Sequence, residues 1–288
     1  MRSIITVSVF ASALIGFADF SPEVLYVDKE KGDDVAAAAD ETGKTPFKTI
    51  QKAVDVAIDG MTILVAPGVY DQGNGDPPAN GGWGLSRVGW ANKKLFLKST
   101  HGPQVTHITG VHSKDTDLGI GNGAVRCLAF KSDNGAGAGS VVEGFTLRDG
   151  ATVNDGGVGY KAWGGAFYSN SHDFHVVNCV ISNCVAYQAG VFAHGTLYRC
   201  LVEGNAVKSG QYLVCSSLST RSRLYSSVLT RNHTEKDGIL AYNVDMIGCS
   251  LIGNKFGSCT YNATGSARNC VFLGTGGLYD FLWSPRYR

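Results

Sequence analysis

The side chains best suited to chemistry are concentrated in one stretch, RDGATVNDGGVGYKAWGGAFYSNSHDFH at residues 148–175. Its polar and aromatic residues include Asp155, Tyr160, Lys161, Trp163, Tyr168, His172, Asp173 and His175. Aromatic faces stack on sugar rings, and an adjacent histidine and aspartate can exchange protons. We therefore predict that Trp163, Tyr168, His172, Asp173 and His175 bind a ligand. The alternative is that the aromatic rings only pack on the scaffold beneath them.

A second segment, DQGNGDPPANGGWGLSRVGWANKK at residues 71–94, is rich in glycine and proline and carries Trp83, Arg87 and Trp90. Tryptophan is largely buried in folded proteins, so two of them in a polar loop are uncommon. We predict that Trp83 and Trp90 form the other wall of a ligand-binding groove. The alternative is a solvated loop without a function.

No metal or cofactor is predicted. His172 and His175 have no second histidine at the spacing of a metal site, and none of the eight cysteines forms a Cys-x-x-Cys pair. Calcium would be needed only if the protein were a polysaccharide lyase, because such enzymes hold it on carboxylate oxygens.

Internal repeats indicate the scaffold that positions these residues. The segments VEGFTLRDG, VVNCVISNC, LYRCLVEGN, LYSSVLTRN, MIGCSLIGN and ARNCVFLGT align at intervals of 34, 21, 27, 22 and 21 residues. One aligned column holds Phe145, Cys179, Cys200, Ser227, Cys249 and Cys270. Apolar columns stand two residues later (Leu147, Ile181, Val202, Leu229, Leu251, Phe272) and three residues earlier (Val142, Val176, Leu197, Leu224, Met246, Ala267). Short strands at this period predict a β-helix; leucine-rich repeats lack support because their extra leucines are missing.

The spacing of the columns predicts a corner in each turn of the solenoid. Positions are counted from the first column, which is position 0. Side chains at −3, 0 and +2 all point inward, although strict alternation would turn those at −3 and 0 to opposite sides. The alternation is therefore interrupted at −1, which marks a bend between two short strands. Asn205, Asn232 and Asn254 stand five residues after the first column, with Cys184 and Thr275 in the flanking turns. Stacked amides bond from turn to turn, so we predict a structural asparagine ladder.

Four cysteines, Cys179, Cys200, Cys249 and Cys270, share the first column and are predicted to point inward. A ladder of buried thiols is one interpretation. The other is two disulfides, Cys179–Cys200 and Cys249–Cys270, although neighbouring strands hold their Cβ atoms wider apart than most disulfides do.

The outward positions next to the first column give little support to catalysis. The residues at −1 and +1 are Asn178, Val180, Arg199, Leu201, Ser226, Val228, Gly248, Ser250, Asn269 and Val271, and none of them is a carboxylate. A glycoside hydrolase needs two carboxyl groups beside the scissile bond, and a lyase needs carboxylates for calcium. No catalytic residue is therefore assigned, and a lyase or hydrolase remains the alternative function.

The body is predicted to be all-β, because residues 104–284 contain no proline and the chain is rich in glycine, 38 of 288 residues. One amphipathic helix over 47–58 precedes it, with Ile50, Val54 and Ile58 on its apolar stripe. A solenoid's first turn exposes an apolar cross-section, so we expect this helix to cap it.

The N-terminus, MRSIITVSVFASALIGFADF, has one positive charge followed by a short apolar run and small residues. This pattern predicts a cleaved signal peptide over 1–18, and the run is short for a membrane anchor. The formal net charge is +1, which gives no electrostatic case for nucleic acid or an anionic membrane. We predict a secreted or cell-surface protein with no membrane span after cleavage.

The segments LYVDKEKGDD and GKTPFKTIQKAVDVAIDGMTILVAPGVY, with the turns NCVISNC, RCLVEGN and GCSLIGN, resemble the right-handed parallel β-helix proteins of the pectin lyase-like superfamily, in particular its secreted bacterial members. The resemblance covers about residues 24–275. It implies a single-stranded right-handed parallel β-helix and leaves the activity open, since that superfamily holds lyases, hydrolases, epimerases and adhesive proteins.

These observations predict four parts: a signal peptide at 1–18, an N-terminal segment with the capping helix at 19–60, a parallel β-helix at 61–276 and a tail at 277–288. The tail offers no polar cap, so we expect truncation, or self-association at the C-terminal end; the alternative is that Tyr279, Phe281, Leu282 and Trp283 fold back as a lid. The expected function is contact with a polysaccharide or cell-surface glycan. The alternatives are a lyase or hydrolase and a structural or adhesive stalk.

Overall fold

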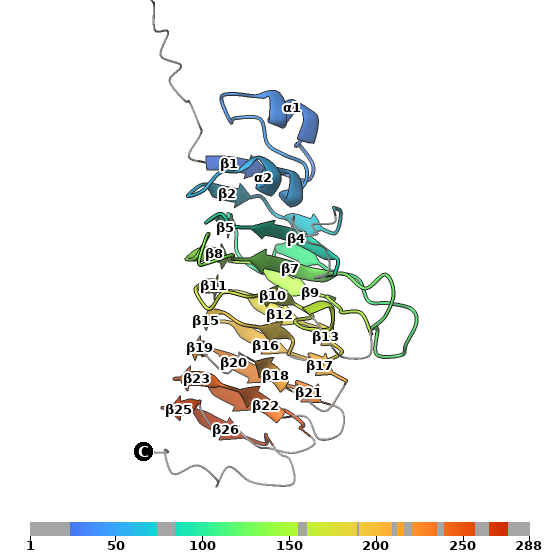
Figure 1. The fold of residues 1–288 in the computed structure, drawn as a ribbon, viewed down its shortest axis with the longest axis vertical. Coiled ribbons are helices and arrows are strands. Elements are labelled where there is room, and N and C mark those ends of the chain that lie inside the picture. Colours follow the sequence, from blue (N-terminus) through green and yellow to red (C-terminus); the bar gives the residue numbers. More distant parts are fainter. Residues whose placement is uncertain are drawn as a thin grey trace, which may run out of the picture.

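The computed structural model describes residues 24–73, 84–154, 160–188, 190–208, 212–215, 221–234, 239–256 and 265–275. In these ranges every paired strand runs parallel to its neighbours, and the strands stack in columns along one axis (Figure 1). The chain therefore forms a parallel β-helix, with the right-handed coil that parallel connections almost always take. The predicted fold class is confirmed.

Four sheets make up the described part of the solenoid. The first sheet holds β1 (Val24–Val27), β2 (Thr62–Val65), β5 (Phe96–Ser99), β8 (Ser140–Glu143), β11 (Phe174–Val177), β15 (Thr196–Tyr198), β19 (Ser222–Tyr225), β23 (Val244–Ile247) and β25 (Ser266–Arg268). The second holds β3 (Gly68–Tyr70), β6 (Thr106–Thr109), β9 (Thr146–Arg148), β12 (Val180–Ser182), β16 (Leu201–Glu203), β20 (Val228–Thr230), β24 (Ser250–Ile252) and β26 (Val271–Leu273). The third holds β4 (Ser86–Ala91), β7 (Arg126–Lys131), β10 (Phe167–Ser169), β14 (Phe192–Ala193), β18 (Tyr212–Cys215) and β22 (Ile239–Tyr242), and the fourth holds β13 (Val185–Ala186), β17 (Ala206–Val207) and β21 (His233–Thr234).

The strand registers confirm the aligned columns. Val176 pairs with Val142 on one side and Leu197 on the other, and Ile181 pairs with Leu147 in the same way. All of these side chains are buried in one continuous core. The −1 positions are the predicted corners: Asn178, Arg199, Ser226 and Asn269 have φ between 47° and 53°, and Gly248 has 65°. Asparagine and glycine adopt this left-handed conformation most readily.

The asparagine ladder is confirmed. Asn205 Nδ2 donates to Asn232 Oδ1 at 2.9 Å, and Asn232 Nδ2 donates to Asn254 Oδ1 at 2.9 Å. The ladder continues to the flanking turns, where the backbone N–H of Cys184 donates to Asn205 and Asn254 donates to the Thr275 hydroxyl. The three asparagines are fully buried, so each bond satisfies a group that would otherwise be costly to bury.

The four cysteines of the first column, Cys179, Cys200, Cys249 and Cys270, carry free thiols. The buried residues Cys127 and Cys184 also carry free thiols. The thiol-ladder interpretation therefore holds in the structure, and the two disulfides are not formed. Burial raises the pKa of the Cys200 thiol to about 11, which keeps it protonated at neutral pH. Such a thiol is a poor nucleophile and acts as a small apolar side chain.

The capping helix is shorter than predicted. It is α2 (Ile50–Val56), and it packs with Ala53 and Val54 against the interior of β1 and β2 at the N-terminal end (Figure 1). Ile58 was predicted on the buried stripe, and this is wrong: the helix ends before Ala57, which is extended with ψ 141°, and Ile58 is 54% exposed. Lys93 closes the helix end, since its Nζ donates to the carbonyl oxygens of Val54 and Ala57.

A second helix, α1 (Asp34–Ala39), precedes α2 and was not predicted. Asp33 caps it by accepting from the backbone N–H groups of Val35 and Ala36. Asp34 then reaches across to α2, where it accepts from the N–H of Thr49 and from its hydroxyl. The first sheet also begins before these helices, because β1 already pairs with β2.

The long interval between Phe145 and Cys179 was interpreted as one inserted loop, and the structure corrects this. β10 lies inside it as a regular strand of the third sheet, beside the short 3₁₀ turn Tyr160–Ala162. Relative to the next turn of the solenoid, the connection before β10 is longer by nine residues and the connection after it by four. The chemistry-bearing residues are therefore split between two places.

Three predictions fall on residues outside the described ranges: the signal peptide at 1–18, Trp83, and the tail at 277–288. Within the described ranges, no helix has the length and apolar character needed to cross a bilayer.

Candidate functional site

The outer face of the first sheet brings together side chains from turns that are far apart in sequence. The residues at −2 and −4 of the repeat point outward here, because Val176 and Leu197 between them point inward. The −2 column contains Glu143, Val177, Tyr198, Tyr225 and Ile247, and the −4 column contains Val141, His175, Thr196, Arg223 and Asp245. Ring-bearing and charged side chains therefore stand in register on β11, β15, β19 and β23.

Two tyrosines form the centre of this face. The rings of Tyr198 and Tyr225 stack at 4.8 Å between centroids and 5° between planes, which is the spacing of neighbouring strands. The His175 ring lies next to the Tyr198 ring, with 5.9 Å between the ring centroids. Because the two tyrosine rings cover each other's faces, a ligand would reach their edges and hydroxyl groups. The result is a row of hydrogen-bonding groups one strand apart.

A histidine–aspartate pair adjoins the tyrosines. His175 Nε2 lies 2.7 Å from Asp173 Oδ1, and Asp173 is largely exposed. The sequence offered the adjacent His172 and Asp173 for acid–base chemistry; in the structure the partner of Asp173 is His175, two residues away. Asp173 lies in the bend immediately before β11, and His175 is the second residue of that strand.

The charges around the tyrosines are mixed. Burial is the largest cause that raises the pKa of Tyr198, followed by Tyr225, while Arg223 acts in the opposite direction. Burial also lowers the pKa of His172, and the positive charge of Arg223 lowers it further. Arg223 thus lies within electrostatic reach of both rings. It is exposed, and no salt bridge to it is found in the described part of the chain.

Trp163 and Tyr168 belong to a second aromatic group, on the outer side of the third sheet. Tyr168 is 1% exposed and lies under Trp163 and Tyr160, with ring centroids 6.3 Å and 5.5 Å away. Tyr168 was predicted to contact a ligand, and its burial contradicts this. The exposed ring is Tyr160, at 50%.

Buried Arg126 supports this second group from below. Its guanidinium lies 5.8 Å from the Tyr168 ring centroid, and its Nη2 donates to the carbonyl oxygens of Tyr160 and Lys161 at 3.0 and 3.1 Å. Trp163 is also fixed, because its Nε1 donates to Gln188 Oε1 at 3.2 Å. The 3₁₀ turn is thus held rigidly over the solenoid.

Histidines join the two groups around the corner between β10 and β11. His194 lies 6.1 Å from Tyr168 and 5.0 Å from His172, measured between ring centroids. Burial, and next the charge of His172, lower the pKa of His194 to about 4. Both histidines are therefore neutral at pH 7. Trp163, His172, Asp173 and His175 thus lie along one band, with Tyr168 as its support.

The second predicted wall is only partly present. Trp90 was predicted to bind a ligand, and this is wrong: it is 1% exposed in the core, against Phe130 and Phe174 at 5.5 and 5.8 Å. It points inward because β4 begins at Ser86 and alternates. The predicted second segment, residues 71–94, nevertheless lies close to the first, residues 148–175. A Cβ atom on Gly84 would lie 3.6 Å from Lys161 Cα.

Sequence reasoning missed Tyr198, Tyr225, Arg223 and Asp245. They stand at −2 and −4, on either side of the inward −3 residue, and not at the −1 and +1 positions next to the first column. The signal was present in the repeat itself, at −2 and −4. No group of three or more histidine, cysteine, aspartate or glutamate side chains placed to hold a metal is found within the described ranges.

The stacked parallel strands define the class: this is a parallel β-helix protein. The profile of DUF1565, a family described as a protein of unknown function, matches residues 31–77. That match covers the helices α1 and α2 and the strands β2 and β3, and it begins after β1. No curated protein matches the chain.

Among solved structures, the chain is similar to a pectin methylesterase mutant in complex with a hexasaccharide, at 14% identity and a TM-score of 0.37, over 79% of this chain and 78% of that one. It is also similar to Escherichia coli ybhC, at 11% identity and a TM-score of 0.40, over 95% of this chain and 88% of that one. At these scores the assignment of the fold rests on the strand pairing.

Proposed function

We propose that the protein binds a polysaccharide along the outer face of the first sheet, without cleaving it. The observation that carries the proposal is the row of His175, Tyr198 and Tyr225 on three consecutive strands, with exposed Arg223 beside it. Rings supply apolar edges, and hydroxyl and imidazole groups supply hydrogen bonds, which is the mixture that a sugar surface needs. Tyr160 and Trp163 extend the same band around the corner.

Binding is favoured over hydrolysis by the state of the carboxylates. The carboxylates at the described part of this face already have partners: Glu143 pairs with Lys98, Asp173 with His175, and Asp245 with Arg221. A glycoside hydrolase needs one carboxylic acid and one free carboxylate flanking the scissile bond. The Asp173–His175 pair is the group best placed for acid–base chemistry, and it is the first to test if products form.

We further propose that the protein acts outside the cell or at its surface. The support is the apolar run after Arg2, which has the length and small-residue ending of a secretory signal. The N-terminus of the protein recovered from the medium of expressing cells should begin near residue 19. Recovery of the intact N-terminus inside the cells only would contradict secretion.

The binding proposal is tested with a panel of immobilised uronate and neutral glycans. The intact protein should be retained by at least one of them, and the double variant Tyr198→Ala/Tyr225→Ala should lose most of that retention. Tyr26→Ala is the matched control, because Tyr26 is 44% exposed on the same face at the first strand. Equal losses in both variants would refute the site.

The same panel separates binding from catalysis. New reducing ends would indicate hydrolysis, and ultraviolet absorbance of unsaturated ends would indicate a lyase. Either product, lost in Asp173→Asn, would replace the binding proposal with the corresponding enzyme. No retention on any glycan would leave the structural stalk as the function and overturn the proposal.

A further inference from the structure

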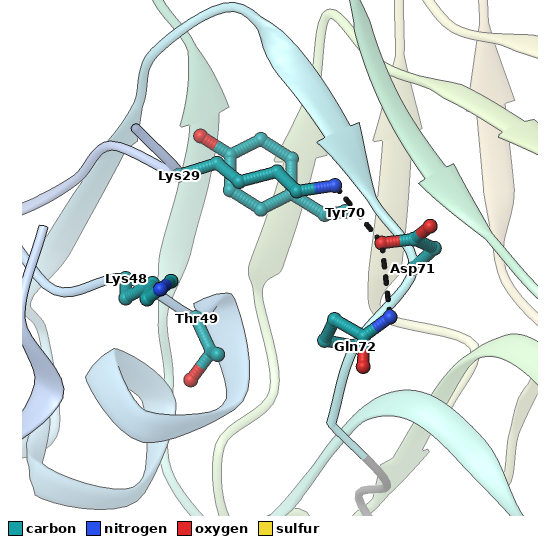
Figure 2. A pocket seen from close by; sticks show the side chains of 6 residues that line it. All are labelled: Lys29, Lys48, Thr49, Tyr70, Asp71 and Gln72. Carbon is teal, nitrogen blue, oxygen red and sulfur yellow. Dashed lines mark hydrogen bonds and ion pairs between the residues drawn. The ribbon is translucent and has the colours of Figure 1, made fainter. Parts of the chain in front are cut away.

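A pocket lies at the N-terminal end of the solenoid, several turns before the tyrosine row. About 280 Å³ of space not filled by protein atoms, part of it open solvent, lies between the residues just before α2 and the end of β3 (Figure 2). Its lining residues are Lys29, Lys48, Thr49, Tyr70, Asp71 and Gln72. Five of the six fall within residues 31–77, the segment similar to DUF1565.

One side of the pocket is a fixed ion pair. Lys29 Nζ donates to the carbonyl oxygen of Val69 at 2.5 Å and to Asp71 Oδ1 at 3.0 Å. The bond from Lys29 is the largest cause that lowers the pKa of Asp71, so the pair stays charged at neutral pH. An ammonium group has three donors, and two are used here, so Lys29 retains one for a ligand.

The opposite side carries a cation that is not neutralised inside the pocket. No hydrogen bond or ion pair to the Lys48 ammonium is found within the described residues, and Lys48, an exposed residue just before α2, lines the cavity (Figure 2). The charge of Lys48 contributes to lowering the pKa of Asp33, but Asp33 does not line the pocket. Its carboxylate already accepts hydrogen bonds from the N–H groups of Val35 and Ala36. With Lys29 and Asp71 cancelling, the pocket lining has a net charge of +1.

The remaining surface is apolar or a hydrogen-bond acceptor. Tyr70 donates its hydroxyl to Ala66 O at 2.9 Å, and burial raises its pKa to about 12, so it presents a neutral ring. Gln72 turns its Nε2 toward Asp71 at 3.4 Å, which leaves its amide oxygen as an acceptor. A ligand with an anionic end, a small apolar body and a hydroxyl group would match these three features.

We propose that this pocket binds a small organic monocarboxylate, with the carboxylate held between Lys48 and the remaining N–H of Lys29. Two ammonium donors on opposite sides suit the two oxygens of one carboxylate. Tyr70 is 4% exposed, so only the small accessible part of its ring touches the carbon body, and Gln72 accepts from a hydroxyl group. The site is separate from the glycan-binding face and does not depend on it.

Lactate is the probe, with lactamide as its uncharged counterpart and inorganic phosphate as an anion without a carbon body. Melting of the full chain is followed over a concentration series of each, at constant ionic strength. Lactate should give a saturable rise in melting temperature, because a ligand that binds only the folded state stabilises it. Lactamide and phosphate should give none.

The variant Lys48→Gln removes the unpaired cation and should weaken lactate binding about tenfold, as the loss of a charge-assisted hydrogen bond does. Lys44→Gln is the matched control, because Lys44 is exposed in the same loop and does not line the pocket. Both variants keep their backbone bonds, so their melting without ligand should equal that of the parent.

Three results would overturn the proposal. These are an equal response to lactate and lactamide, a response to phosphate as strong as that to lactate, and equal binding by Lys48→Gln and Lys44→Gln. The double variant Tyr198→Ala/Tyr225→Ala should bind lactate normally, so failure at this pocket and failure at the glycan-binding face are distinguishable.

Discussion

The interior of the solenoid and the outer face of its first sheet are built from the same strands, yet they follow different rules. Inside, neighbouring turns repeat small or apolar residues at each position, and the stack of Asn205, Asn232 and Asn254 repeats an identical one. Outside, the −2 column changes from Glu143 through Val177 to Tyr198 and repeats once, at Tyr225. Repetition satisfies groups that must be buried, whereas a surface that recognises a ligand needs variety. Function is therefore expected where the repeat is least regular.

The largest effect should come from placing a charge in the interior at the cap. Val54→Asp buries an unpaired carboxylate against β1 and β2 and should lower the free energy of unfolding by about 3–5 kcal/mol. Ile58→Asp is the control, since Ile58 is exposed, and it should change stability by less than about 0.5 kcal/mol. Urea unfolding followed by circular dichroism measures both. Equal stability of the two variants would show that α2 does not cap the solenoid.

The second effect concerns acid. His194 titrates at about 4 in the folded protein and near 6.5 when unfolded, so the unfolded state binds more protons between these values. Stability should therefore fall as the pH falls from 6.5 to 4, by about 3 kcal/mol from this residue. His194→Asn tolerates the same left-handed backbone, φ 58°, and should flatten the dependence. Urea midpoints at pH 7.5, 5.5 and 4 measure it; the same slope in the variant would contradict the assignment.

The third effect concerns the ladder. Asn232→Leu keeps the volume and removes the acceptor for the N–H and the side chain of Asn205. Leaving these buried donors unpaired should cost about 2–3 kcal/mol. Asn122→Leu is a suitable comparison, because Asn122 is exposed and its backbone is not in the left-handed region, so leucine adds no strain there. Thermal melting that ranks Asn122→Leu as the more damaging change would contradict the role of the ladder.

The fourth and smallest effect on stability should come from the outer band. Trp163→Ala removes one hydrogen bond, to Gln188, and a partly exposed ring, so it should cost no more than about 1–2 kcal/mol while weakening glycan retention. Tyr168→Ala should be worse for stability, because that ring is buried. If Tyr168→Ala weakened retention without any loss of stability, Tyr168 would be a direct contact.

The interior could be predicted from the sequence because its columns repeat. A residue such as Ile181 is identified by its neighbours in other turns, Leu147 and Val202, without knowledge of the structure. The asparagine ladder and the corner at Asn178 followed from the same alignment. The helix α1 could also have been found, since Asp33 precedes a run of helix-favouring alanines.

The outer surface could not be predicted in the same way. β10 lies in a turn with thirteen extra residues, where no repeat shows that Tyr168 belongs to a strand. Trp90 resembled a loop residue because glycines and prolines precede it, although the alternation of Val88 and Trp90 is that of a strand. Tyr198 and Tyr225 are different, because both stand at −2 in consecutive repeats, and their stacking could have been predicted from the alignment.

The most direct test of the glycan-binding face is calorimetric titration of the retained glycan into the parent protein and into the single variants Tyr225→Ala and Tyr26→Ala. The row on β11, β15 and β19 predicts that Tyr225→Ala weakens binding by about 3- to 10-fold, the value of one aromatic contact, while Tyr26→Ala binds as the parent does. Unchanged affinity in Tyr225→Ala, together with an unchanged melting temperature, would contradict binding at this face.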